Sequence, residues 1–96
     1  MDIQEISFAL GDPGLSQALA ISSTSAQSAA ILTDSAIVTP TIDCFVRQGS
    51  NPTAASDGSD MFLLGSVSYR LALPRGNKLA FKTTAASGTV YITPGA

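Results

Sequence analysis

The feature that most constrains this chain is a period-two alternation of apolar and polar residues, broken by turns at intervals of about ten residues. Period two places successive side chains on opposite faces of a strand, and helical periodicity is hard to find in this sequence. Pro- and Gly-containing turn sequences punctuate the alternation: GDPG at 11–14, PRGN at 74–77 and AASG at 85–88. Such spacing is typical of an antiparallel sandwich or barrel. We therefore expect an all-β fold, an antiparallel β-sandwich of jelly-roll-like or Greek-key type with about seven to eight short strands.

The N-terminal third predicts one hairpin and one ambiguous stretch. Alternating runs at 6–10 and 15–21 flank the GDPG turn and predict the hairpin. The stretch SSTSAQSAAIL at 22–32 could be an irregular strand or a short helix, because Ala favours helix while Ser and Thr favour caps and turns. Residues 1–14 are therefore expected to form an N-terminal arm or the first hairpin strand, and residues 15–96 the sandwich domain.

From Ile37 to Gly49 the alternation is sharper and predicts a strand in which Cys44 faces inward. Pro40 cannot donate a ladder hydrogen bond, so this strand should begin at a sheet edge or contain a bulge near 39–41. Four further strands follow the loop at 49–60, one in the MFLLG run at 61–65 and three around two inward sets. These sets are Val67, Tyr69, Leu71 and Leu73, then Leu79, Phe81, Val90 and Ile92 across the AASG turn.

Composition excludes several classes of function. Charged residues are 12% of the 96-residue chain and the net charge is −2, so no basic stripe is available for phosphates and we expect no nucleic-acid partner. No apolar run approaches the roughly 18 residues of a membrane span. The sequence MDIQEISFAL lacks the basic segment and apolar run of a secretory signal. A single cysteine cannot form an internal disulfide, which favours synthesis in the cytoplasm.

The inventory for catalysis is poor. The chain has no histidine, the commonest general base and metal ligand. Cys44 would need a neighbouring base or cation to act as a nucleophile, and a buried apolar role between Ile42 and Val46 is the stronger interpretation. Asp57 and Asp60, with Asn51, suggest calcium, but their spacing matches no established calcium loop. We predict a protein that is not an enzyme, with no catalytic, cofactor-binding or metal-binding residues.

Four segments carry a resemblance to a known family: TIDCFVRQGSNPTAA, SDMFLL, RLALPRGNKLAF and SGTVYITP. Together they span roughly residues 36–94 and resemble a recurring small protein of tailed bacteriophages. That family has an alternating strand ending in Arg-x-Gly, a Pro-Thr-Ala loop, an Asp-x-Phe-Leu strand and a final Ser-Gly-Thr strand. Residues 1–35 match it poorly.

The resemblance implies a compact β-sandwich located in the virion and made in the host cytoplasm. Its most direct implication is a decoration, or cement, protein that attaches to the assembled capsid and stabilises it. A neck, collar or tail component, or a surface-displayed carbohydrate-binding module, is the alternative. The implied partners are the major capsid protein or other virion subunits, and a homo-oligomer, dimer or trimer, is expected. The family pattern transfers no catalytic residues.

Contacts with such partners are expected at the N-terminal segment, at the loop 49–60 and at outward aromatic side chains, because termini and loop tips can reach outward from a sandwich. For the N-terminal segment the alternative is that its apolar residues pack within the protein's own first hairpin. The candidate contact residues are Ile3, Ile6, Phe8, Leu10, Phe45, Arg47, Asn51, Asp57, Asp60 and Tyr91.

Overall fold

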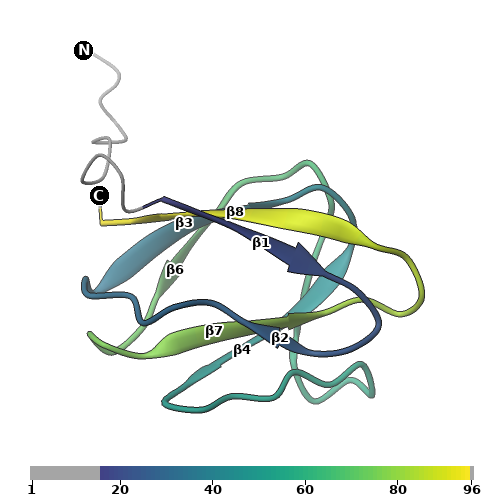
Figure 1. Cartoon of the computed structure of the whole chain (residues 1–96), viewed down its shortest axis with the longest axis horizontal. Helices are drawn as coiled ribbons and strands as arrows, with labels where there is room; N and C mark the ends of the chain where they lie inside the picture. The colour runs from purple at the N-terminus through teal and green to yellow at the C-terminus, as the bar shows by residue number, and fades with distance from the viewer. Residues whose placement is uncertain (1–15, 96) are drawn as a thin grey trace.

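Two four-stranded antiparallel sheets lie face to face in the computed structural model, which describes residues 16–95 (Figure 1). Sheet A contains, in spatial order, β1 (Gln17–Ile21), β8 (Gly88–Pro94), β3 (Ser35–Pro40) and β6 (Tyr69–Ala72). Sheet B contains β2 (Ala26–Gln27), β7 (Lys78–Lys82), β4 (Cys44–Gly49) and β5 (Met61–Leu63). The described residues include no helix, and so none that could cross a membrane. The all-β sandwich and its number of strands are confirmed.

The strand pairing is that of a jelly roll. β1 pairs with β8, β2 with β7, β3 with β6 and β4 with β5, and every pair is antiparallel. The chain is thus arranged as one long hairpin whose turn is the connection between β4 and β5. Successive strand pairs of this hairpin lie alternately in sheet A and sheet B. Two further pairings, β3 with β8 and β4 with β7, complete each sheet. This is the eight-strand, two-sheet arrangement of jelly rolls, one of the two expected topologies.

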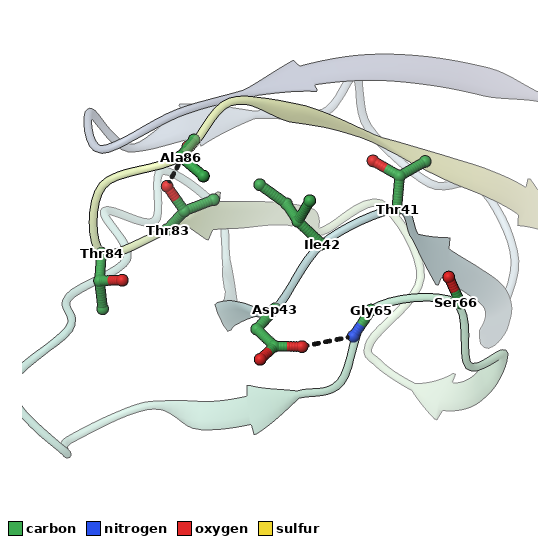
Figure 2. A pocket seen from close by; sticks show the side chains of 8 residues that line it. All are labelled: Thr41, Ile42, Asp43, Gly65, Ser66, Thr83, Thr84 and Ala86. Carbon is green, nitrogen blue, oxygen red and sulfur yellow. Dashed lines mark hydrogen bonds between the residues drawn. The ribbon is translucent and has the colours of Figure 1, made fainter.

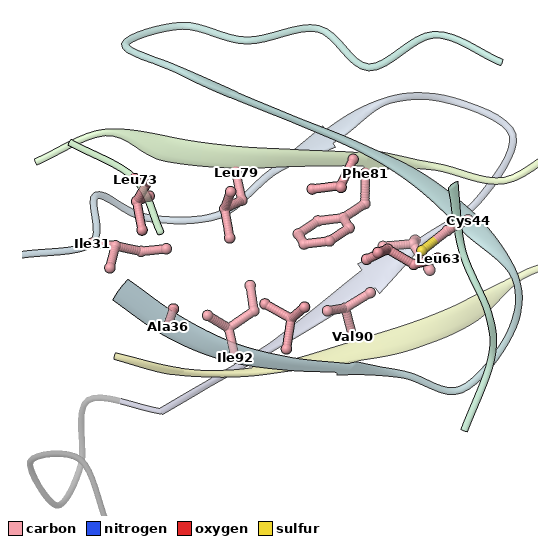
Figure 3. Close-up of a cluster of buried hydrophobic side chains, with 12 residues drawn as sticks. Ile31, Ala36, Cys44, Leu63, Leu73, Leu79, Phe81, Val90 and Ile92 are labelled. Atoms are coloured by element: carbon pink, nitrogen blue, oxygen red, sulfur yellow. The ribbon is translucent and has the colours of Figure 1, made fainter. Parts of the chain in front are cut away.

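The core lies between the sheets and follows the predicted alternation. Leu79 and Phe81 of sheet B face Val90 and Ile92 of sheet A, and each of the four is at most 2% exposed (Figure 3). Cys44 is fully buried in the same cluster. The inward sets of β4, β7 and β8 are therefore as the sequence predicts, because in a sandwich every second side chain of a strand meets the opposite sheet.

The expected strand from Ile37 to Gly49 is instead two strands in different sheets, β3 and β4. Pro40 is the last residue of β3, which is an interior strand, so the prediction of an edge or a bulge was wrong. Thr41 N donates to Thr89 O on β8 at 2.8 Å, so the nitrogen of Pro40 points to the other side, beyond the end of β6. The missing N–H thus costs no ladder bond.

The structure also corrects or confirms sequence predictions for the N-terminal third and for the segment after β5. The stretch 22–32 is irregular apart from β2, so the alternative of a short helix was wrong. Val67 was expected to face inward but is 41% exposed. It belongs to the connection before β6, where Ser66 has a positive φ of 64° and turns the chain. β1 confirms the second strand of the expected hairpin, whereas its first strand at 6–10 lies outside the described residues.

Candidate interaction surfaces

The outer face of sheet B is covered by the loop at 49–60, which forms a third layer. The loop leaves β4 and reaches β2 on the far side of β7, where the Gln27 amide donates to Asn51 Oδ1 at 2.7 Å and to the Pro52 carbonyl at 2.9 Å. It then returns to β5 along the outside of the sheet (Figure 1). Ala80, which points outward from β7 between Gln27 and Arg47, is consequently 0% exposed. β7 is therefore buried on both faces.

Asp60 fastens this loop at its return to the sheet. Its Oδ1 accepts a hydrogen bond from Arg47 Nε at 2.6 Å, and its Oδ2 accepts one from Ala55 N at 2.7 Å. Arg47 also donates to the Ser59 hydroxyl at 3.2 Å. The Asp60 side chain is only 4% exposed. Arg47 and Asp60, two of the predicted contact residues, are thus brought together, and the Asp60 carboxylate is engaged within the chain.

Asp57 lies at the exposed tip of the same loop. Hydrogen bonds from the Ser59 hydroxyl at 2.6 Å and the Ser59 amide at 3.0 Å hold the pKa of Asp57 below its usual value. This is the local turn in which an Asp side chain accepts from the backbone two residues on. Within residues 16–95, no group of three or more His, Cys, Asp or Glu is placed to hold a metal ion.

The outer face of sheet A is left uncovered by residues 16–95. None of its side chains is buried, and Tyr91, a predicted contact residue near its middle, is 54% exposed. Strand pairing places Tyr91 between Ala18 of β1 and Thr39 of β3. The face is almost uncharged, because Arg70 is the only charged residue on its four strands. Its outward residues are Ala18, Ala20, Ser35, Ile37, Thr39, Arg70, Ala72, Thr89, Tyr91 and Thr93.

A ridge of exposed apolar side chains follows β5, the edge strand of sheet B. Met61, Phe62, Leu64 and Val67 are 54%, 48%, 50% and 41% exposed, and they are four of the six large hydrophobic residues exposed in the described chain. Phe62 packs on Phe45, with ring centroids 5.2 Å apart. Phe45 is therefore half-buried beneath the ridge. Below Met61, a hollow of about 170 Å³ opens between β5 and β6.

The sequence prediction did not identify this ridge, although a signal was present. A strand that faces a core on one side should alternate, and the run Met61–Phe62–Leu63–Leu64 does not. Consecutive apolar residues on an edge strand must leave some side chains in solvent, because the strand has only one inward face. Here Leu63 is the fully buried member.

A polar hollow of about 470 Å³ lies between the loops at 41–43, 64–66 and 83–86 (Figure 2). Gly65 N donates to Asp43 Oδ1 at 2.8 Å and so joins two of the loops, whereas the Thr83 hydroxyl donates to the Ala86 carbonyl within the third. A Cβ added at Gly65 would lie 2.7 Å from the Ile42 Cα, so the loops are also in close contact. Hydroxyl groups of Thr41, Ser66 and Thr84, with the Asp43 carboxylate, line the opening.

Cys44 is not placed for nucleophilic chemistry. It is 0% exposed, and burial, assisted by the nearby charge of Asp43, raises the pKa of its thiol from 9.0 to about 11. Arg47, on the opposite face of β4, is engaged with Asp60. A thiol with a raised pKa carries little thiolate at neutral pH, and the thiolate is the reactive form.

Comparison with family models, with curated proteins and with solved structures finds no match to this chain.

Proposed function

We propose that this protein is a structural virion protein that attaches to an assembled phage capsid and stabilises it. The observation that carries the proposal is the open outer face of sheet A, which is broad, nearly uncharged and lined by small side chains around Tyr91. Such a face suits close contact with another protein because few charges must be desolvated. The capsid is proposed as the partner because residues 36–94 resemble small phage proteins. Jelly rolls occur in viral capsid and lectin domains, which is support by fold analogy only.

The described chain begins beside this same face. Ser16, the first described residue, has its hydroxyl 3.2 Å from that of Thr93, which points outward from β8. The apolar residues Ile3, Ile6, Phe8 and Leu10 precede it in sequence. We propose that residues 1–14 and the outer face of sheet A form one continuous contact with the shell.

Attachment at a single site would be weak. Two or three apolar side chains contribute only a few kcal/mol at about 25 cal/mol per Å², which is less than the cost of association. Occupancy then depends on simultaneous contacts of an oligomer with several shell subunits, which raise the effective concentration. The proposed role requires no catalytic group.

A decoration assay tests the proposal. Purified protein is mixed with capsids that lack it, and bound protein is measured after sedimentation. Ala18→Glu places a charge on the face next to Tyr91 and is expected to reduce binding at least tenfold, as is deletion of residues 1–10. Leu32→Glu is the matched control, because Leu32 is 65% exposed and lies outside sheet A's strands. Unchanged binding of Ala18→Glu would contradict the proposal, and unfolding of the truncated chain would instead place residues 1–10 within its own sandwich.

Cryo-electron microscopy of the intact particle separates the capsid from the alternative locations. Density for this jelly roll at the neck, collar or tail would replace the decoration role with that of a component there. The contact through sheet A would then be tested against the subunit that it touches.

A second candidate function, carbohydrate recognition, is favoured by the polar hollow at 41–43, 64–66 and 83–86. Hydroxyls and one carboxylate can exchange hydrogen bonds with sugar hydroxyls, although the hollow has no aromatic residue for stacking. NMR titration with monosaccharides tests this role. Shifts at Gly65 and Ser66 that disappear in Asp43→Ala would support it, and no shift at millimolar sugar would exclude it.

A further inference from the structure

Within residues 16–95, β5 is an edge strand that lacks the protection found at the edges of β2 and β6. Natural sheets guard an edge with charges, short strands or covering loops. β2 has two residues, and its Gln27 is held by the loop 49–60; β6 carries the charged Arg70. β5 carries apolar side chains only, and residues 61–67 include no charge. Two of its three side chains, Met61 and Phe62, are about half exposed.

The backbone of β5 offers one residue for pairing at this edge. Gly65 N donates back toward Asp43, which precedes β4, whereas Leu64 N donates to Tyr69 Oη at 2.9 Å, on the side of β6. N–H directions alternate along a strand, so the N–H and C=O of Phe62 point away from β4, as the N–H of Leu64 does. Phe62 therefore presents both its donor and its acceptor at the free edge.

We propose that β5 pairs with β5 of a second copy of this chain, antiparallel about a two-fold axis that passes beside Phe62. Phe62 and Phe62 of the partner subunit would then exchange two backbone hydrogen bonds, as a hydrogen-bonded antiparallel pair does. The two sheets B would become one continuous eight-stranded sheet. On its outer face, the Phe45–Phe62 contact would extend across the axis into a row of four aromatic rings.

A second copy fits this edge because the edge is complementary to itself. A two-fold contact pairs the patch with an identical patch, so a net charge on it would face a surface of the same charge. Residues 61–67 have none, and the adjacent Asp60 is neutralised by Arg47 at 2.6 Å. The register also places Met61 opposite the partner's Leu63, apolar against apolar.

The exposed area predicts a small interface. Four side chains that are each about half exposed offer on the order of 300 Å² of apolar surface per chain. Two copies with their polar rim then reach the lower end of the range for specific interfaces, below about 1,200 Å² in total. Such a dimer forms at micromolar or higher protein concentration. This inference does not rest on the proposed attachment to a capsid, because the isolated chain tests it.

Sedimentation equilibrium of the purified full chain is the first test. We expect a concentration-dependent shift from one chain to two, and at least a tenfold increase in the dissociation constant for Phe62→Asp. Leu32→Asp, which places the same charge at a residue that is 65% exposed elsewhere, should leave the dissociation constant unchanged. A protein that remains monomeric at millimolar concentration, or a mass of three chains, would overturn the proposal, as would a Phe62→Asp variant that associates normally.

A cross-link tests the register even if Phe62→Asp fails to fold. Paired residues on the two-fold have Cα atoms about 5.5 Å apart, within the range that a disulfide spans. Phe62→Cys in a Cys44→Ala background should therefore oxidise to a disulfide-linked dimer. Leu32→Cys in the same background is the control and should cross-link at least tenfold more slowly. Equal rates for the two variants would exclude a two-fold contact at Phe62.

Discussion

The two outer faces of this sandwich differ in whether the described chain covers them, even where the same residue type points outward. On sheet B the loop 49–60 lies over the strands, and Ala80 on that face is 0% exposed. On sheet A the face has no cover from the described chain, and none of its outward side chains is buried. Ala20 and Ala80 are thus the same residue type at outward strand positions, one exposed and one in a second core. A small outward residue alone does not reveal whether another layer covers it.

The difference arises from the routes that the connections take. The connection from β4 to β5 is long enough to cross the sheet and return, and its ends are fixed by Gln27 on one side and by Arg47 and Asp60 on the other. The β3–β4 connection at 41–43 is short and only carries the chain from one sheet to the other. Sheet B therefore has a third layer of its own, and sheet A leaves its face for other contacts.

The largest expected effect is at Ala80. Ala80→Glu would place a carboxylate with no partner beneath the loop, and we expect a loss of about 3–5 kcal/mol in the free energy of unfolding. Ala20→Glu, on the open face, should stay within about 0.5 kcal/mol. Urea denaturation followed by circular dichroism measures both. Equal effects of the two substitutions would mean that the loop does not cover sheet B in solution.

Removal of the loop's fastening should have the next largest effect. Asp60→Ala deletes both acceptors and leaves Arg47 Nε and the Ala55 amide without partners, so we expect a loss of about 2–4 kcal/mol. Asp34→Ala is the matched control, because the Arg75–Asp34 pair is long at 3.4 Å and both side chains are well exposed. Its loss should be below about 0.5 kcal/mol. Hydrogen exchange at Ala55 should accelerate only in Asp60→Ala; unchanged exchange there would contradict the role of the clamp.

Substitution of Cys44 tests the packing of the core between the two sheets. Cys44→Ser should cost about 1–3 kcal/mol, because the hydroxyl enters an apolar site. The folded thiol has its pKa raised from 9.0 to about 11 by burial. The folded state therefore keeps its proton longer than the unfolded state, so this contribution to stability is complete below pH 9 and is lost as pH rises from 9 to 11. Cys44→Ala should lack that component of the alkaline decrease. Rapid labelling of the native thiol by a bulky maleimide at pH 8 would contradict its burial.

The smallest effect on stability is expected at Tyr91. Tyr91→Ser removes a ring that is 54% exposed on the open face, and the free energy of unfolding should change by less than about 1 kcal/mol. Thermal unfolding measures this change. A loss above about 2 kcal/mol would show that the face is covered in the isolated protein, for example by residues 1–14.

The low number of basic residues in the sequence leads to a further prediction, which concerns binding to nucleic acid. The chain has five basic residues, of which Lys78 and Lys82 share β7 while the other three lie on β4, β6 and the turn at 74–77, and two of the five are paired with acids. We expect no salt-sensitive DNA binding at micromolar protein near physiological salt. A gel-shift titration at varied salt concentration measures this, and retardation of DNA that decreases as salt rises would contradict it.

Alternation in the sequence determined the strands and the inward direction of their side chains. Cys44, Val46, Val90 and Ile92 are buried as predicted, because a strand turns every second side chain to the same face. The turn at 74–77 was also local: Asn77 N bonds to Pro74 O at 3.1 Å, and Gly76 adopts the positive φ of 91° that such a turn favours. These features depend on neighbouring residues in the chain, so neighbouring residues were sufficient to predict them.

Only the tertiary structure decided which sheet each strand joins and which outward positions are covered. The sequence placed Arg47 and Asp60 on the surface as contacts, but the path of the loop brings them together at 2.6 Å. It also treated the run at 61–65 as an ordinary strand, whereas the position of β5 at an edge leaves Met61, Phe62 and Leu64 exposed. The physical reason is that alternation fixes the direction of a side chain relative to its own strand. Whether water or another layer lies in that direction depends on segments distant in the sequence, which local patterns do not specify.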